Sequence, residues 1–175
     1  DLNLFSSKVV KLFKNKVKDY GLGKPFLFVE PGRYLVCDSS ILITTVNTVK
    51  VTPSRKFIGV DAGFNTLLRP TMYGSYHQIL VANKLDESDK ETYDVAGPLC
   101  ESGDILAKER NLPTVEEGDL LAVLNVGAYG FSMSSQYNSR PRAAEVLIRQ
   151  GKSIPIRNRE QLGDLVSSQK VQCES

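Results

Sequence analysis

The chain has 175 residues, enough for one domain with a full core or for a smaller domain plus a piece of another. Its 22 basic and 20 acidic residues give a net charge of +2, which is too small to indicate a nucleic-acid partner. Apolar runs stay well below the roughly 20 residues that a membrane helix needs, and no basic-then-apolar leader opens the sequence. We therefore expect no membrane partner and a cytoplasmic location.

Few side chains are available for metal or thiol chemistry. Cys37, Cys100 and Cys173 are odd in number and widely spaced, which argues against a disulfide framework or a zinc site and predicts reduced thiols. His77 is the single histidine, so no metal is expected, and general-acid work falls to Cys, Tyr, Glu, Asp or Lys. We interpret His77 as structural and both Cys37 and Cys173 as incidental thiols.

The first 33 residues have the pattern of an α/β unit. Apolar residues at helical spacing predict an amphipathic helix over residues 5–20, which Gly21 and Gly23 end. The continuous apolar run at residues 26–29 is typical of a buried parallel strand. Residues 30–33 (Glu-Pro-Gly-Arg) follow directly, either as a ligand-binding loop beyond the strand end or as a plain Pro-Gly turn.

From Leu35 onward the pattern becomes one of short strands, which predicts a β-sandwich or barrel. The predicted domains are residues 1–36 and 37–175, with a short terminal helix near residues 163–166. The expected strands lie at residues 41–51, 56–60, 77–82, 91–96, 105–107, 119–124 and 144–148.

Polar clusters interrupt this strand pattern at two places. Arg69 and Tyr73 are four residues apart and would share a face if their turn is helical, as a site or as an arginine packed on a tyrosine ring. Tyr129 stands between Gly127 and Gly130 after an apolar run, as a site residue or as a tyrosine anchored at a strand end.

A third polar stretch, residues 97–104, places the Cys100 thiol beside the Glu101 carboxylate in a loop punctuated by glycine and proline. On their own, a cysteine of this kind is more often a small buried side chain and such a glutamate more often a solvated acid than either is catalytic.

Together these stretches resemble the diaminopimelate decarboxylases, which belong to the alanine-racemase-like class of pyridoxal-phosphate enzymes. The resemblance extends from about residue 20 to residue 165 and rests on the order of the motifs. These are Glu30-Pro31-Gly32-Arg33, Asp61-Ala62-Gly63, Arg69-Pro70 with Tyr73, residues 97–104, Gly127-Ala128-Tyr129-Gly130 and Tyr137-Asn138-Ser139-Arg140-Pro141.

The resemblance implies the last helix and strand of an (α/β)₈ barrel followed by a C-terminal β domain. It also implies pyridoxal 5'-phosphate as cofactor, decarboxylation of meso-diaminopimelate to L-lysine and CO₂, and a homodimer with active sites at its interface. Nothing here resembles the family's lysine-bearing first barrel strand or its glycine-rich phosphate loop. No lysine of this chain is therefore expected to form the Schiff base, and we expect the chain to be inactive without an N-terminal barrel portion.

Roles carry over from the family residue by residue. The resemblance makes Cys100 the proton donor, a role that suits a thiol because its ordinary pKa lies near neutrality. It also implies that the Cys100–Glu101 loop reaches across the dimer into the partner's site. Cofactor contacts are implied for Glu30, Pro31, Gly32, Arg33 and Tyr129, and substrate contacts for Arg33, Arg69, Tyr73, Glu101 and Tyr129.

Two alternatives stay open at this point. The first is a related decarboxylase acting on ornithine, lysine or carboxynorspermidine, because a fold does not fix its substrate. The second is a catalytically inactive regulatory or assembly homologue that keeps the β domain as an interaction surface.

Overall fold

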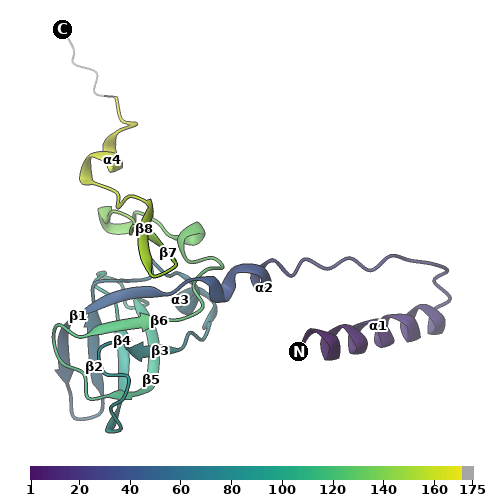
Figure 1. Cartoon of the computed structure of the whole chain (residues 1–175), viewed down its shortest axis with the longest axis horizontal. Coiled ribbons are helices and arrows are strands. Elements are labelled where there is room, and N and C mark those ends of the chain that lie inside the picture. The colour runs from purple at the N-terminus through teal and green to yellow at the C-terminus, as the bar shows by residue number, and fades with distance from the viewer. Residues whose placement is uncertain (171–175) are drawn as a thin grey trace. The chain divides into compact units, whose positions relative to one another are not determined.

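The computed structural model describes residues 1–170, so Cys173 lies outside the described residues. The chain divides into two compact units, Asp1–Pro31 and Gly32–Ser175 (Figure 1). The expected boundary after residue 36 stays a prediction about domains in the complete protein.

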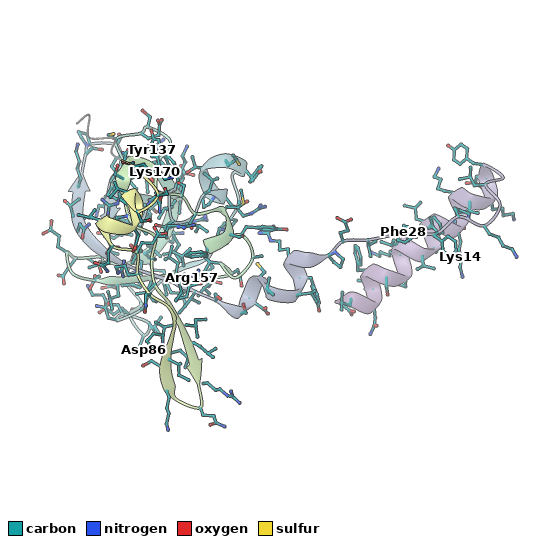
Figure 2. All side chains as sticks on the ribbon, turned by 90° about the horizontal axis from the view of Figure 1, so that it is seen from above. Lys14, Phe28, Asp86, Tyr137, Arg157 and Lys170 are labelled. Atoms are coloured by element: carbon teal, nitrogen blue, oxygen red, sulfur yellow. The ribbon has the colours of Figure 1, made fainter. Side chains whose placement is uncertain are left out.

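The first unit is built on helix α1 (Leu2–Asp19), which confirms the predicted helix. Asp1 begins the helix, because its carboxylate accepts hydrogen bonds from the backbone N–H groups of Asn3 (2.8 Å) and Leu4 (3.1 Å). None of its residues is buried, and Figure 2 shows its side chains, Lys14 among them, projecting from the helix. The apolar face of α1 therefore has no packing partner within its own unit.

The strand predicted at residues 26–29 is absent, and this part of the chain is extended without strand pairing. Phe26 and Phe28 are each 85% exposed. A parallel strand exists only through hydrogen bonds to its neighbours, and residues 1–170 contain no strand that pairs with this segment. The apolar composition that suggested a buried strand remains without the sheet that would bury it.

The second unit contains a six-stranded sheet in the order β3-β6-β1-β2-β4-β5 (Figure 1). Neighbouring strands are antiparallel except β2 and β4, which run parallel. The edge strands β3 and β5 also contact each other, so the sheet is nearly closed into a barrel, and the predicted mainly-β fold is confirmed. The strands are β1 (Leu42–Val51), β2 (Lys56–Val60), β3 (Ile79–Val81), β4 (Lys90–Ala96), β5 (Ile105–Pro113) and β6 (Leu120–Val123).

The core fills the inside of this barrel with side chains from several strands and from the loop after β2. Ile58, Val95 and Leu121 come from three different strands and Leu67 from that loop, and all four are fully buried. His77 is buried just before β3, where its Nδ1 lies 2.9 Å from the Leu124 carbonyl oxygen, as suits a structural histidine. The core fixes the strand ends, and the loops that leave them carry the candidate site.

Short elements fill the remainder of the unit. The strand expected at residues 144–148 is β7 (Glu145–Arg149), and its hairpin partner β8 (Lys152–Arg157) was not predicted. Helix α4 (Leu162–Val166) confirms the predicted terminal helix. The other short helices are α2 (Gly32–Val36), η1 (Cys37–Ser39), α3 (Arg69–Tyr73), η2 (Phe131–Met133) and η3 (Tyr137–Ser139). No helix in the described part of the chain is both long enough and apolar enough to cross a membrane.

One carboxylate ties the segment after β8 to the segment before β7. Glu160 accepts hydrogen bonds from Arg142 Nε (2.7 Å), the Arg142 backbone N–H (2.9 Å) and Gln136 Nε2 (3.0 Å). These donors, Arg142 first, lower the pKa of the Glu160 carboxyl from 4.5 to about 2.

We expect Glu160→Gln to lower the urea midpoint of unfolding at pH 6. The pKa of Glu160 is lower in the folded chain, so its contribution is present above about pH 4.5 and is lost as the pH falls through about 2. The difference between the two chains should therefore shrink between pH 5 and pH 3, as followed by circular dichroism. Glu117→Gln, at an exposed position, is the control, and a difference independent of pH would contradict this role.

Candidate functional site

The loop at residues 97–104, here called the thiol loop, connects β4 to β5 and carries Cys100 and Glu101 on its exposed side. The buried Asp104 carboxylate closes it by accepting from the backbone N–H of Leu99 (2.8 Å). The Gly97 N–H also donates to the Asp104 carbonyl oxygen (2.9 Å). The inward-pointing Asp104 carboxylate thus sets the conformation of the loop, while the Cys100 thiol and the Glu101 carboxylate stay accessible to solvent.

Asp104 also joins the thiol loop to the turn after β2. Its Oδ1 accepts from the Phe64 N–H (2.7 Å), and a Cβ built on Gly97 would lie only 2.2 Å from its Oδ2. Burial raises the pKa of the Asp104 carboxyl above its ordinary value, against the opposing effects of the two N–H donors and the charge of Arg140. This close packing requires glycine at position 97 and leaves the loop little freedom to shift.

The Cys100 thiol contacts a side chain from a distant part of the sequence. Asn138 Nδ2 donates to Cys100 Sγ across 3.2 Å, and both residues are exposed. Asn138 belongs to the Tyr137-Asn138-Ser139-Arg140-Pro141 motif. The structure therefore brings two of the sequence motifs together at the thiol.

Arg69, Tyr73 and Tyr129 form a second group, here called the arginine cluster. The Arg69 guanidinium lies over both rings, 4.9 Å from the Tyr73 centroid and 4.7 Å from that of Tyr129. Because α3 is helical, Arg69 and Tyr73 share a face as predicted, and the arginine does pack on the ring. Arg69 Nε is buried without a hydrogen-bond partner, so part of its donor capacity is unused.

Backbone contacts hold Tyr129 in this position. The preceding Gly127 donates its N–H to the Cys37 carbonyl oxygen (3.0 Å), and a Cβ at residue 127 would lie 1.9 Å from the Val36 carbonyl oxygen. Tyr129 itself has a φ of 68°, in the left-handed region that side chains other than glycine seldom adopt. Non-glycine residues in this conformation occur in turns and also cluster at functional sites.

The arginine cluster and the thiol loop are joined by one hydrogen bond, from Thr71 Oγ1 in α3 to the Gly103 carbonyl oxygen (2.8 Å). Among residues 1–170, no side-chain hydrogen bond or ion pair links Cys100 or Glu101 to Arg69, Tyr73 or Tyr129. The predicted residues therefore form two groups that share one framework without a direct side-chain bond between them.

The predicted cofactor residues of the Glu-Pro-Gly-Arg turn are divided between the two units. Glu30 and Pro31 end the first unit, whereas Gly32 and Arg33 begin the second in α2. All four residues are exposed, and no ion pair of Arg33 occurs within residues 1–170. The arginine is therefore available to an anionic group supplied from outside the described residues.

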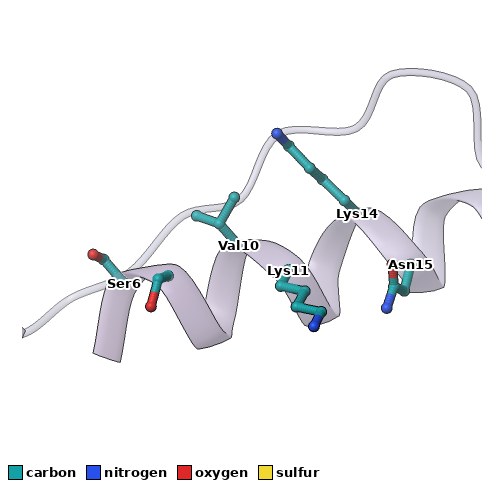
Figure 3. Close-up of a pocket in the computed structure, with 6 residues that line it drawn as sticks. Ser6, Val10, Lys11, Lys14 and Asn15 are labelled. Carbon is teal, nitrogen blue, oxygen red and sulfur yellow. The ribbon is translucent and has the colours of Figure 1, made fainter. Parts of the chain in front are cut away.

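The hollow shown in Figure 3 contains none of the predicted site residues. Its lining comes from exposed side chains of α1, with Val10 and Lys14 on one side of the helix and Lys11 and Asn15 on another. In residues 1–170, no group of His, Cys, Asp and Glu side chains is arranged to hold a metal ion.

Sequence reasoning missed the supporting residues Thr71, Asp104 and Asn138. Asp104 could have been found from its position, since an acid that closes a glycine-rich loop directly before an apolar strand often caps that loop. Asn138 stands in one of the sequence motifs, but nothing in the sequence indicates its partner, which lies 38 positions away.

Known proteins with similar sequences indicate the family to which this sheet domain belongs. A protein-family model described as "Pyridoxal-dependent decarboxylase, C-terminal sheet domain" matches residues 16–127. The diaminopimelate decarboxylase of Methanothermobacter thermautotrophicus is 59% identical over 171 residues, which are 98% of this chain and 40% of that protein. The one from Archaeoglobus fulgidus is 51% identical over 95% of this chain and 39% of its own length.

A solved structure shows the same fold. The diaminopimelate decarboxylase from M. jannaschii in co-complex with L-lysine superposes with a TM-score of 0.78 and 41% identity, covering 91% of this chain and 36% of that one. This chain thus spans about 40% of the length of the curated relatives it matches. Since the family model covers more than half of the chain, the chain belongs to the pyridoxal-dependent decarboxylases and corresponds to their C-terminal sheet domain.

Proposed function

We propose that this chain acts as part of a pyridoxal-phosphate-dependent enzyme that decarboxylates meso-diaminopimelate to L-lysine and CO₂. The observation that carries the proposal is the arginine cluster, which presents a guanidinium with an unused buried N–H beside two tyrosine rings. The relatives at 59% and 51% identity are named for this activity, and one similar structure was solved with L-lysine.

Charge supports the choice of substrate. Diaminopimelate carries an amino-acid group at each end, so its far end presents a carboxylate together with an ammonium. Arg33, Arg69 and the Tyr73 hydroxyl can bind that carboxylate, and Glu101 can bind the ammonium. Ornithine and lysine present only an ammonium there, which two arginines would repel.

The residues present also fit the cofactor. Arg33 has no ion-pair partner within residues 1–170 and is available to an anionic group of the cofactor or the substrate, and Tyr129 is 38% exposed and offers an aromatic surface. A Cβ built on Gly32 would meet nothing within 4 Å beyond its chain neighbours and its own helix, which leaves this backbone open to a ligand, and Glu30 and Pro31 precede it in the sequence. Pyridoxal phosphate, when bound, supplies an electron sink for the electron pair released by loss of the carboxyl group.

Cys100 then supplies a proton in this proposal. Its thiol is exposed at the tip of a loop held by Asp104, so it can reach a substrate carbon outside its own domain. We further propose that it does so in the partner subunit of a homodimer, and that the enzyme works in the cytoplasm. The exposed position of Cys100 and Glu101 on their loop supports the dimer, because an exposed loop can enter the site of another subunit.

An assay of the complete protein on meso-diaminopimelate, ornithine and lysine tests the substrate. We expect release of CO₂ from diaminopimelate alone. Turnover of ornithine without diaminopimelate would contradict the proposal in favour of a polyamine-pathway enzyme, and no turnover of any of the three would favour an inactive assembly homologue.

Arg69→Lys in the complete protein is expected to raise the KM for diaminopimelate about tenfold, although the positive charge is kept. Lysine lacks the planar fork that binds a carboxylate at two points and stacks between two rings. The matched control is Arg110→Lys, because Arg110 also stacks on a tyrosine, 3.9 Å from the Tyr76 centroid, but lies in β5 outside the proposed site. An unchanged KM for Arg69→Lys would mean that Arg69 serves only in packing.

A further inference from the structure

The contact between Asn138 and Cys100 differs from the other hydrogen bonds of the thiol loop because it joins two exposed side chains and involves no backbone group. Asn138 Nδ2 donates to Cys100 Sγ across 3.2 Å between residues 38 positions apart. Both side chains are exposed, so neither core packing nor local backbone geometry forces them together. The contact depends on how the two loops that carry these residues are anchored.

Both loops are anchored on the same turn, residues 61–65 after β2. The Phe64 N–H donates to Asp104 of the thiol loop (2.7 Å), and the Phe64 ring packs on the Tyr137 ring with centroids 5.2 Å apart. Arg140 Nη2 donates to the Asp61 carbonyl oxygen (3.3 Å). Attachment to one shared turn therefore sets the distance between the asparagine amide and the thiol.

The backbone at Asn138 indicates that its side chain is used. Asn138 and Ser139 have φ values of 56° and 54°, which place two successive non-glycine residues in the left-handed region. Glycine would meet this backbone requirement more easily but could not reach the sulfur. Asparagine combines tolerance of the left-handed conformation with an N–H donor.

We propose that Asn138 is a positioning residue for the Cys100 thiol. Its amide holds Sγ in one orientation and stabilises the sulfur after it has given up its proton, since a hydrogen bond to a charged acceptor is stronger than one to a neutral acceptor. The purpose of this contact rests on the proposed proton-donor role of Cys100. Because both residues belong to one chain, Asn138 accompanies Cys100 wherever the thiol loop acts, the partner subunit's site included.

Alkylation by iodoacetamide tests the contact without any turnover, because only the thiolate reacts. Peptide mass mapping of the complete protein at one fixed pH gives a separate rate for Cys100 and uses Cys37 and Cys173 as internal standards. Asn138→Gly keeps the left-handed backbone and removes the amide, and it should slow Cys100 about threefold. Asn138→Asp replaces the donor by a like charge and should slow Cys100 about tenfold or more. Neither variant should change the rates at the other two cysteines.

The charge-matched control is Asn111→Asp. Asn111 is exposed in β5 and accepts from Thr92 Oγ1 (2.8 Å), a bond that an aspartate keeps. It should leave the Cys100 rate unchanged. A Cys100 rate in Asn138→Gly that equals or exceeds the parent rate overturns the proposal, whatever the aspartate variant does.

A kinetic readout separates this inference from the proposed function. In the complete protein, Asn138→Asp should lower kcat for diaminopimelate and leave KM within about twofold. Slower alkylation in a protein that never turns over diaminopimelate would leave the contact standing and remove the proposed function. Unchanged alkylation in an active decarboxylase would do the reverse.

Discussion

Cys100→Ala in the complete protein is expected to lower kcat for meso-diaminopimelate by about 10²- to 10³-fold and to leave KM within about twofold. The thiol is exposed at the tip of its loop and accepts a hydrogen bond from the Asn138 amide. This arrangement suits a group that gives up a proton and is then reprotonated from solvent. Alanine removes the proton but keeps the loop, because Asp104 and not Cys100 fixes the loop conformation. Steady-state release of CO₂ measures the effect.

Cys173→Ala serves as the control, because Cys173 belongs to none of the sequence motifs, and its kcat should match that of the parent. A kcat for Cys100→Ala within about twofold of the parent would remove Cys100 from the chemistry. A rise in KM alone would assign it to substrate binding.

The same variant shows whether the thiol loop acts across a dimer. At a diaminopimelate concentration below the parent KM, the Cys100→Ala and Arg69→Ala proteins should each have little activity alone, because each lacks one of the two groups. When the two are unfolded together and refolded, half of the dimers are mixed, and one site in each mixed dimer has both native groups. About a quarter of the parent activity should return. If Cys100 completes the site of its own chain, every site carries a defect and no activity returns.

Most of the barrel could be predicted because its strands are short runs rich in apolar residues that stand between turn residues. β2 was predicted to the residue, since its apolar core positions stand between turn residues on both sides. β8 was missed because Pro155 stands within it and only Ile154 and Ile156 are apolar, so its apolar alternation is short and interrupted by a residue that strands disfavour. The run at residues 26–29 failed for the opposite reason, because its apolar residues match a sheet that residues 1–170 do not contain.

Some contacts of the candidate site could likewise be predicted from the sequence, and others could not. Arg69 and Tyr73 could be paired from sequence because their spacing of four matches one helical turn. The addition of Tyr129 to the same guanidinium could not be predicted, since it depends on a left-handed residue beyond β6. Asp104 and Asn138 have partners about 40 positions away, a separation that only the three-dimensional fold brings within hydrogen-bond distance.

Asp104→Ala is expected to lower the free energy of unfolding by about 2–4 kcal/mol. The substitution leaves the N–H groups of Leu99 and Phe64 without acceptors, and an unsatisfied buried donor costs about 1–3 kcal/mol. Asp104→Asn keeps one acceptor oxygen for these two donors and should cost about half as much. Urea unfolding followed by circular dichroism measures both. The control is Asp38→Ala at an exposed aspartate, which should stay within about 0.5 kcal/mol of the parent.

The free energy of unfolding of the parent chain minus that of Asp104→Asn should depend on pH. This dependence distinguishes a buried carboxyl group from one that is exposed at the surface. Burial raises the pKa of Asp104 in the folded chain, so folding favours its protonated form. The parent chain therefore loses stability as the pH rises from the ordinary value of 3.8 through the raised folded value, whereas the asparagine variant has no such loss. The stability gap between parent and Asp104→Asn should widen as the pH is lowered from 7 to 4. A gap that narrows over this range would mean that the hydrogen bonds and Arg140 outweigh burial, and that Asp104 holds the thiol loop as a stabilised anion.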